Sequence, residues 1–247
     1  MDHEQSVLGV DIGGSSIKFC ILTEGKIGLH ETVYYENGTN PPEILEMILR
    51  KISDWKFVGR VGIGFPGLIE GERIIDAPNL GIDWKGYDLL GHLRKEVDCR
   101  FAIINDADAA ALAMYRETSG WENENILCLT LGTGIGSSWL KKGELEAGTE
   151  YGRIVHPELH CSLERWASVR TLNEEKLSIH EWVNRLSSIL QFLETTYNPD
   201  RFILSGGITT SSDDWLQSIT ENVQTPVLVS TYGDLTGAVG AAKLHLV

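Results

Sequence analysis

The sequence contains one arrangement twice: an apolar strand, a glycine-rich turn and a returning strand. The first copy, VLGVDIGGSSIKFCIL, begins at Val7, and the second, ILCLTLGTGIGSSWL, begins at Ile126. A supersecondary unit that recurs within one chain is typical of a protein with two similar lobes. Glycine turns between strands also occur in unrelated hairpins, so the residues of these two segments alone leave both interpretations open.

Strands and helices alternate around both copies, which predicts an α/β protein. Pro41 and Pro42 suit the first turn of a helix, and apolar residues recur at helical spacing from Ile44 to Ile52. The other expected helices are 87–97, 107–116, 179–196 and 235–246. The expected strands are 7–10, 17–22, 26–35, 57–65, 101–104, 126–131, 137–140, 201–204 and 226–229.

Charge and cysteine usage exclude several classes of protein. The formal net charge of −14 argues against nucleic acid or an anionic membrane as the main partner. No apolar run approaches the roughly 20 residues that a membrane helix needs. The polar start, residues 1–6, does not resemble a signal peptide. The four cysteines form no CxxC pair, so neither a disulfide framework nor a cysteine-rich zinc site is expected. Free cysteines suit a reducing compartment, so we expect a cytoplasmic location.

The segment GIGFPG, residues 62–67, fits the GxGxxG pattern of a dinucleotide-binding turn. That function requires a helix directly after the turn, with the pyrophosphate at its N-terminus. Pro66 and Gly71 bracket a segment too short for such a helix. The chain also lacks the GxxxxGK[ST] pattern of a P-loop, so neither common nucleotide fold is expected.

The segment DIGGSSIK, residues 11–18, suits phosphate binding. Gly13 and Gly14 permit positive φ, which would let successive backbone N–H groups converge on an anion. Asp11, at the strand end, could hold Mg²⁺ through water. Further groups for a phosphate are the two hydroxyls and one ammonium of Ser15, Ser16 and Lys18. The alternative is a plain hairpin with a capping aspartate.

Two later segments offer the same chemistry. Gly132, Thr133 and Gly134 form the turn of the second copy, and Gly206 and Gly207 follow a further apolar strand. A single glycine-rich turn would be weak evidence. Three of them at strand ends predict a substrate that carries a polyphosphate.

Asn105 and Asp106 end the apolar strand FAII and begin a helix. Aspartate is a common helix cap, which is the simplest role for it. The carboxyl end of a strand is also where α/β enzymes place catalytic groups. A kinase needs a carboxylate to accept the proton of the attacking hydroxyl, and Asp106 would suit that role. Asn105 could orient the sugar that carries this hydroxyl.

Taken in order, these motifs resemble the ROK family of sugar kinases, in the sugar kinase/actin/Hsp70 superfamily. The segments that carry the resemblance cover nearly the full length: DIGGSSIK, GIGFPG, DAPNL, NDADAAALA, LGTGIG, FILSGG and LTGAVGAA. The resemblance implies an actin/hexokinase-like (ribonuclease H-like) α/β fold with a cleft between two lobes. We expect the small lobe to contain 1–104 and a closing helix, 234–247, and the larger lobe to contain 105–233.

The resemblance also implies a role for individual positions. Asp106 matches the catalytic base. The positions that match the sugar side of the family are Gly67, Asn79, Asn105, Asp106, Glu150, Arg153 and Glu164. The implied reaction is phosphoryl transfer, with Mg²⁺, from ATP or inorganic polyphosphate to a hexose hydroxyl, with the 6-hydroxyl of glucose as the expected acceptor.

Two departures from the family pattern matter. ROK proteins usually carry a CxCGxxGC zinc motif, and this chain has only Cys161 there, so no zinc is expected. The histidine of the family's ExGH motif is Arg153, which is always charged and only donates hydrogen bonds. The segments TEYGR, LERWAS and IHEWVNRLSSILQFL are most similar to the polyphosphate glucokinase branch, although that branch keeps the histidine.

Arg153 leaves alternatives open. One is a sugar-binding relative that is non-catalytic or has an altered sugar specificity. A DNA-binding ROK repressor is not expected, because the first phosphate loop begins by residue 11. An ATPase like Hsp70 or actin would not need the ND and DAPNL motifs. The hexose, the choice of donor and the oligomeric state stay open, a homodimer being one alternative.

Overall fold

The computed structural model describes residues 6–35, 40–77, 80–114 and 121–245. The chain divides into two compact units, Met1–Ala113 with Gly237–Val247, and Met114–Thr236. The first unit extends beyond the expected limit at residue 104, because the helix after it packs on the C-terminal helix. At Gly240, an added Cβ would lie 1.6 Å from the carbonyl oxygen of Ala109. No helix within the described ranges is long and apolar enough to span a membrane.

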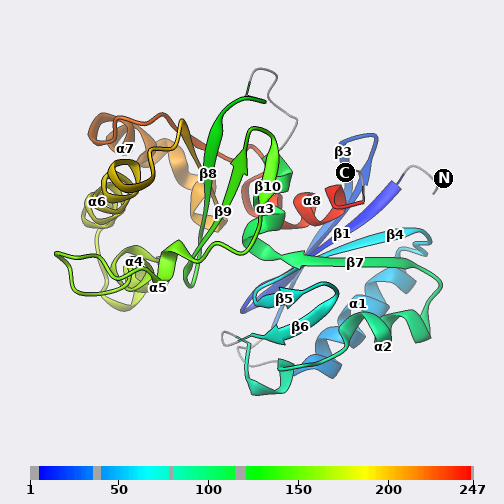
Figure 1. Cartoon of the computed structure of the whole chain (residues 1–247). Helices are drawn as coiled ribbons and strands as arrows, with labels where there is room; N and C mark the ends of the chain where they lie inside the picture. Colours follow the sequence, from blue (N-terminus) through cyan, green and yellow to red (C-terminus); the bar gives the residue numbers. More distant parts are fainter. Residues whose placement is uncertain (1–5, 36–39, 78–79, 115–120, 246–247) are drawn as a thin grey trace. The chain divides into compact units, whose positions relative to one another are not determined.

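The first unit is built on a five-stranded sheet (Figure 1). Its strands, in spatial order, are β3 (Lys26–Tyr34), β2 (Ser16–Thr23), β1 (Ser6–Ile12), β4 (Arg60–Phe65) and β7 (Arg100–Asn105). The first three form an antiparallel meander, and β1, β4 and β7 run parallel. The carboxyl ends of β1, β4 and β7 therefore meet at one edge of the sheet.

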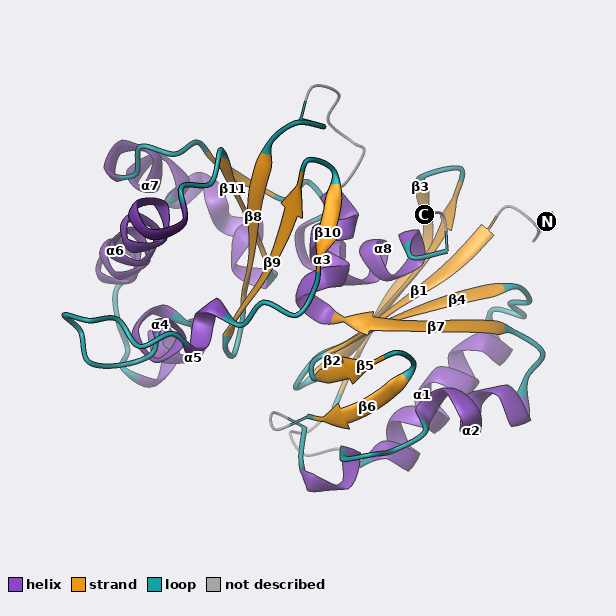
Figure 2. Ribbon diagram, viewed as in Figure 1, coloured by secondary structure: helices purple, strands orange, loops and turns teal. Residues whose placement is uncertain are grey.

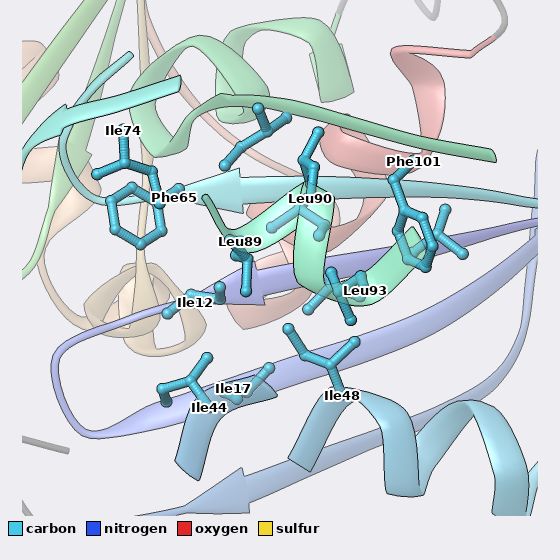
Figure 3. Close-up of a cluster of buried hydrophobic side chains, with 14 of the residues drawn as sticks. Ile12, Ile17, Ile44, Ile48, Phe65, Ile74, Leu89, Leu90, Leu93 and Phe101 are labelled. Carbon is cyan, nitrogen blue, oxygen red and sulfur yellow. The ribbon is translucent and has the colours of Figure 1, made fainter. Parts of the chain in front are cut away.

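Helices α1 (Pro41–Asp54) and α2 (Leu89–Glu96) cover one face of this sheet (Figure 1). The side chain of Asn40 caps α1 by accepting the amide of Glu43, and the prolines begin its first turn as expected. The buried side chains between sheet and helices include Ile12, Ile17, Ile44, Ile48, Phe65, Leu89, Leu90, Leu93 and Phe101 (Figure 3). Each such side chain contributes about 1.5–3 kcal/mol on burial, so this face anchors the unit.

The opposite face packs against α8 (Thr236–Lys243) through glycines. Successive residues of a strand face opposite sides of a sheet, so Leu8 and Val10 join the core beneath while Gly9 faces α8. A Cβ at Gly9 would lie 1.9 Å from the carbonyl oxygen of Ala238, and one at Gly62 would lie 1.8 Å from that of Ala241. The small residues of LTGAVGAA and of the two strands thus allow backbone-to-backbone contact.

A short hairpin that the sequence did not indicate follows β4. It consists of β5 (Leu68–Glu70) and β6 (Arg73–Asp76), and a 3₁₀ turn, Ile82–Trp84, comes after it. Trp84 is fully buried and its ring lies 4.9 Å from that of Phe65. This tryptophan belongs to the core of the first unit.

The second unit repeats the topology of the first (Figure 2). Its strands, in spatial order, are β10 (Glu144–Glu146), β9 (Ile135–Lys141), β8 (Asn125–Leu131), β11 (Arg201–Ser205) and β12 (Val227–Val229). Again three sequential strands are antiparallel, and the first of them pairs in parallel with the next along the chain. The prediction of two similar lobes is confirmed, and the interpretation as unrelated hairpins is wrong.

The long helix of the second unit, α6 (Ile179–Tyr197), has the predicted apolar face. Trp182, Leu186, Leu190 and Leu193 are buried on it. Ser178 and Glu181 form a reciprocal capping box at its start. The unit also contains the shorter helices α4 (Leu163–Ala167), α5 (Val169–Glu174) and α7 (Leu216–Asn222).

Candidate active site

The predicted residues of the first unit gather where β1, β4 and β7 end. Asp11 is paired with Gly64 across β1 and β4, and Phe65 is paired with Asn105 across β4 and β7. The turn at Gly67 follows β4, and α3 (Asp106–Met114) follows β7 directly. Open α/β sheets bind ligands beyond the carboxyl ends of their strands, so this edge is the candidate site of the first unit.

Asn105 has both ends of its side-chain amide engaged. Its Oδ1 accepts the amides of Ala107 at 2.8 Å and Asp108 at 3.3 Å, which caps α3. Its Nδ2 donates to the carbonyl oxygen of Gly67 at 3.1 Å. Asn105 therefore joins the end of β7 to the turn after β4, in addition to any contact with a sugar.

Asp106 is half-buried at the first position of α3, and its Oδ1 accepts the amide of Ala107 at 2.9 Å. Helix capping was the simplest explanation for an aspartate here. Asn105 supplies the cap instead, because its side chain accepts two of the first amides of the helix. Capping therefore no longer suffices to explain a carboxylate at residue 106.

The first phosphate loop is a tight turn between β1 and β2. The amide of Gly13 donates to the carbonyl oxygen of Ser16 at 2.8 Å, while the amides of Gly14 and Ser15 have no acceptor within the described ranges. A Cβ at Gly14 would meet nothing within 4 Å, so there is space beside these amides. Ser15 is exposed, whereas Ser16 is buried.

The expected positive φ at Gly13 and Gly14 is wrong, since neither residue adopts it. The turn is closed by hydrogen bonds rather than by left-handed backbone. Glycine matters there for space: at Gly13 a Cβ would lie 3.2 Å from the carbonyl oxygen of Ser16.

Tyr35 braces this loop and was not predicted. Its hydroxyl donates to the carbonyl oxygen of Gly13, and its amide donates to the carbonyl oxygen of Ser15 at 3.0 Å. Burial, and then the negative charge of Asp11, raise the pKa of the Tyr35 phenol above its usual value. The only sequence signal was its place at the end of an expected strand, which gives no hint of a contact with residue 13.

Asp11 lies between Lys18 and the first turn of α8. Its Oδ2 is 3.5 Å from the Nζ of Lys18, and both side chains are largely buried. A Cβ at Gly237 would lie 2.6 Å from the same Oδ2, so the carboxylate packs directly on this glycine. The ammonium of Lys18 is thus paired with Asp11 and does not stand alone as a phosphate ligand.

The second phosphate loop joins β8 to β9. The amide of Gly132 donates to the carbonyl oxygen of Gly134 at 3.0 Å, and in the part of the chain described here the amides of Thr133 and Gly134 donate to no acceptor. Gly132 and Thr133 are exposed. Gly206 closes in from β11 with φ of 110°, and a Cβ there would lie 2.2 Å from the carbonyl oxygen of Leu131. Gly207 next to it is exposed.

The carboxylate of Glu164 lies against this second loop. A Cβ at Gly134 would be 2.6 Å from Oε2 of Glu164, so this carboxylate lies directly beside the loop backbone. The structure therefore brings a predicted sugar-side residue next to a predicted phosphate-side residue within the second unit.

Arg153 ends an adjoining 3₁₀ turn, Tyr151–Arg153, and Glu150 comes directly before this turn. Ser137 of β9 holds this turn, because its Oγ accepts the amide of Tyr151 at 2.9 Å. Nε of Arg153 lies 3.3 Å from Oε2 of Glu150, with both side chains more than half exposed. The arginine that replaces the expected histidine thus pairs with the glutamate of the same motif.

Asn79 lies outside the described residues, so its predicted sugar contact stays a prediction. The four cysteines are free thiols. Within the described ranges, no group of three or more His, Cys, Asp or Glu side chains is placed to hold a metal ion.

Comparisons with known proteins show the family of this chain. The ROK family model matches residues 7–176, and the chain belongs to the ROK family. It is 31% identical to a polyphosphate glucokinase of Mycobacterium leprae, over 95% of this chain and 72% of that one. It is 30% identical to a polyphosphate glucokinase of Mycobacterium tuberculosis, over 95% of this chain and 89% of that one.

A solved structure agrees over nearly the whole chain. The inorganic polyphosphate/ATP-glucomannokinase of Arthrobacter sp. strain KM superposes with a TM-score of 0.88 at 28% identity, covering 98% of this chain and 99% of that one. A ROK family glucokinase of Streptomyces griseus has the same fold, with a TM-score of 0.79 at 24% identity, over 97% and 98% of the two chains. The actin-like two-lobed fold implied by the motifs is confirmed.

Proposed function

We propose that this protein transfers a phosphoryl group from inorganic polyphosphate or ATP to the 6-hydroxyl of glucose, with Asp106 as the general base. The relatives make it a glucokinase-like phosphotransferase. The observation that carries the assignment of the base is the division of labour at the start of α3. Asn105 caps the helix, and the carboxylate of Asp106 is at the carboxyl edge of the parallel strands.

The chemistry asked of Asp106 is modest. In phosphoryl transfer the transition state is loose, so the protein mainly positions the reactants and stabilises charge. Asp106 accepts the proton of the sugar hydroxyl as that oxygen attacks phosphorus. A positioned general base of this kind contributes about 10²–10⁴-fold to the rate.

The family pattern assigns sugar contacts to residues in each unit. Asn105 and the turn at Gly67 would contact it beside the base, together with Asn79. Glu150 and Glu164 would accept hydrogen bonds from other hydroxyls, because ionised carboxylates act only as acceptors. Arg153 would either donate to a sugar hydroxyl or, through its pair with Glu150 at 3.3 Å, compete with the sugar for that carboxylate.

The donor is assigned to the two glycine-rich turns. Gly14, Ser15, Thr133 and Gly134 have amides without an acceptor in the described ranges, and such amides bind phosphate oxygens well. Gly206 and Gly207 would let a donor approach the end of β11 closely. Each of the two turns, taken by itself, offers such amides to a phosphate group of the donor.

Mg²⁺ fits Asp11 in a supporting role. This carboxylate is near the carboxyl end of β1, next to the first phosphate loop, where the phosphates of the donor would also bind. A single carboxylate suits Mg²⁺, which keeps several waters and takes its other ligands from the donor phosphates. When bound, the ion would neutralise part of the charge on those phosphates. The ammonium of Lys18, 3.5 Å from Oδ2 of Asp11, would help to hold this carboxylate in position.

The names of the similar proteins favour polyphosphate as the donor, and the name of the Arthrobacter enzyme also includes ATP. A purified-protein assay with both donors, against glucose, mannose and N-acetylmannosamine, tests the proposal directly. We expect glucose 6-phosphate with polyphosphate and, at a different rate, with ATP. Sugar binding without turnover by either donor would contradict it and support the non-catalytic alternative.

A further inference from the structure

The start of helix α5 is attached to the second phosphate loop. The carbonyl oxygen of Gly132 accepts the amides of Val169 at 2.9 Å and Arg170 at 3.4 Å. The preceding residue, Ser168, is buried and its Oγ accepts the amide of Thr171 at 3.2 Å. The backbone of Arg170 is therefore held beside an exposed loop whose own amides face no acceptor in the described ranges.

The side chain of Arg170 starts in the direction of that loop. In an α-helix, every Cα–Cβ bond tilts toward the helix N-terminus, and long side chains follow it. Arg170 is the second residue of α5 (Val169–Glu174), so its side chain leans toward the end of the helix that contacts Gly132. Its surface is exposed, which leaves the guanidinium accessible to a ligand.

The charge of Arg170 is also uncompensated. The other arginines of residues 121–236 each pair with a carboxylate: Arg153 with Glu150, Arg165 with Glu174, Arg185 with Glu175 and Arg201 with Glu124. Arg170 alone among these described arginines has no acidic partner. Glu174, four residues further along α5, would be its natural helical partner, but it pairs with Arg165.

We propose that Arg170 is a donor-binding residue that favours inorganic polyphosphate over ATP. The inference rests on the proposed function of the second loop. Amides of Thr133 and Gly134 would hold one phosphate group, and the guanidinium would contact the next groups along the chain. Arginine binds phosphate oxygens in a bidentate manner. Beyond the phosphate groups held by the loop, polyphosphate offers further anionic groups to Arg170. ATP has its nucleoside there instead.

The test compares Arg170→Gln with Arg165→Gln, a matched loss of an exposed arginine one helix earlier. Removing a charged hydrogen bond of this kind should raise KM for polyphosphate about tenfold or more. KM for ATP and for glucose should change less than about twofold. Arg165→Gln frees Glu174 to pair with Arg170, so we expect a smaller rise in KM for polyphosphate and no change in the other two constants. Arg170→Lys should give an intermediate KM for polyphosphate, because the charge remains without the planar fork.

Direct titration of polyphosphate into each variant provides a second measurement that needs no turnover. Weaker binding by Arg170→Gln, with less dependence on salt, supports the inference. Equal binding by the two arginine variants, or an equal rise in KM for both donors, would overturn it. Wild-type protein that phosphorylates glucose from ATP yet does not bind polyphosphate would also overturn it, while leaving the kinase assignment intact. Failure of the proposed function itself would instead appear as no sugar phosphate from either donor.

Discussion

The hydroxyl of Tyr35 donates to the carbonyl oxygen of Gly13, in the turn that connects β1 to β2. The same residue holds the carbonyl oxygen of Ser15 with its amide. Two carbonyl groups of the first phosphate loop thus face Tyr35, which leaves the amides of Gly14 and Ser15 for an anion. The loop is shaped by a residue that follows it by two strands.

Tyr35→Phe should therefore weaken the grip of the loop on the donor. We expect KM for either donor to rise about three- to tenfold, since one hydrogen bond contributes about 0.5–1.5 kcal/mol. KM for glucose should stay near the wild-type value. Steady-state kinetics with each substrate varied in turn will check this. A fall in kcat alone, with both KM values unchanged, would show that Tyr35 does not act through donor binding.

The raised pKa of Tyr35 makes a second prediction, about stability against pH. Because the folded-state pKa is higher than the unfolded one, the neutral phenol contributes stability that is complete below the unfolded value of about 10. That contribution is lost as pH rises toward the folded-state pKa. Wild-type protein should lose more thermal stability than Tyr35→Phe between about pH 9 and 11. An equal change in melting temperature with pH for wild type and Tyr35→Phe across that range would contradict the raised pKa of Tyr35.

Asp106→Asn should nearly abolish turnover and leave the fold intact. The side-chain oxygen of the new asparagine can still accept a hydrogen bond from the backbone amide of Ala107, as the carboxylate does at 2.9 Å. The asparagine side chain cannot, however, take a proton from the sugar. We expect kcat to fall about 10²–10⁴-fold with polyphosphate and ATP alike. Thermal melting and glucose titration serve as controls for folding and binding. Retention of most of kcat would transfer the role of base to another group.

Arg153→His tests the departure from the family motif. The exposed Arg153–Glu150 pair contributes little to stability, about 0–1 kcal/mol, so the melting temperature should barely change. Removing the pair frees the carboxylate of Glu150 for a sugar hydroxyl, and we expect KM for glucose to fall several-fold. If KM for glucose rises instead, the arginine itself contacts the sugar. The same assay with mannose shows whether residue 153 affects the preference between glucose and mannose.

Gly240→Ala tests the backbone contact between α3 and α8. A Cβ there would lie 1.6 Å from the carbonyl oxygen of Ala109, and backbone cannot move aside as a side chain can. We expect a loss of at least about 1–3 kcal/mol in the free energy of unfolding. Gly28→Ala is the matched control, because its nearest neighbour would be 3.5 Å away. Chemical denaturation of both variants measures the difference, and equal midpoints would refute the close contact.

Local patterns in the chain were sufficient for some features. The apolar face of α6 follows from the spacing of Trp182, Leu186 and Leu193, and the two glycine turns follow from glycines between apolar strands. Asp106 follows from its place after the strand FAII. Such signals survive in one dimension because strand and helix periodicity depend on near neighbours.

The tertiary structure decided how those pieces are used. Asn105 holds Gly67, Tyr35 holds Gly13, and Glu164 lies on Gly134, although each pair is separated by many residues. Trp84 became a core residue and Arg170 an unpaired charge beside a loop for the same reason. Sequence by itself determined the repeated units, the order of motifs and the candidate base. Only the packing of distant segments determined which side chains support the site, because those contacts depend on strand pairing and close approach that no local pattern encodes.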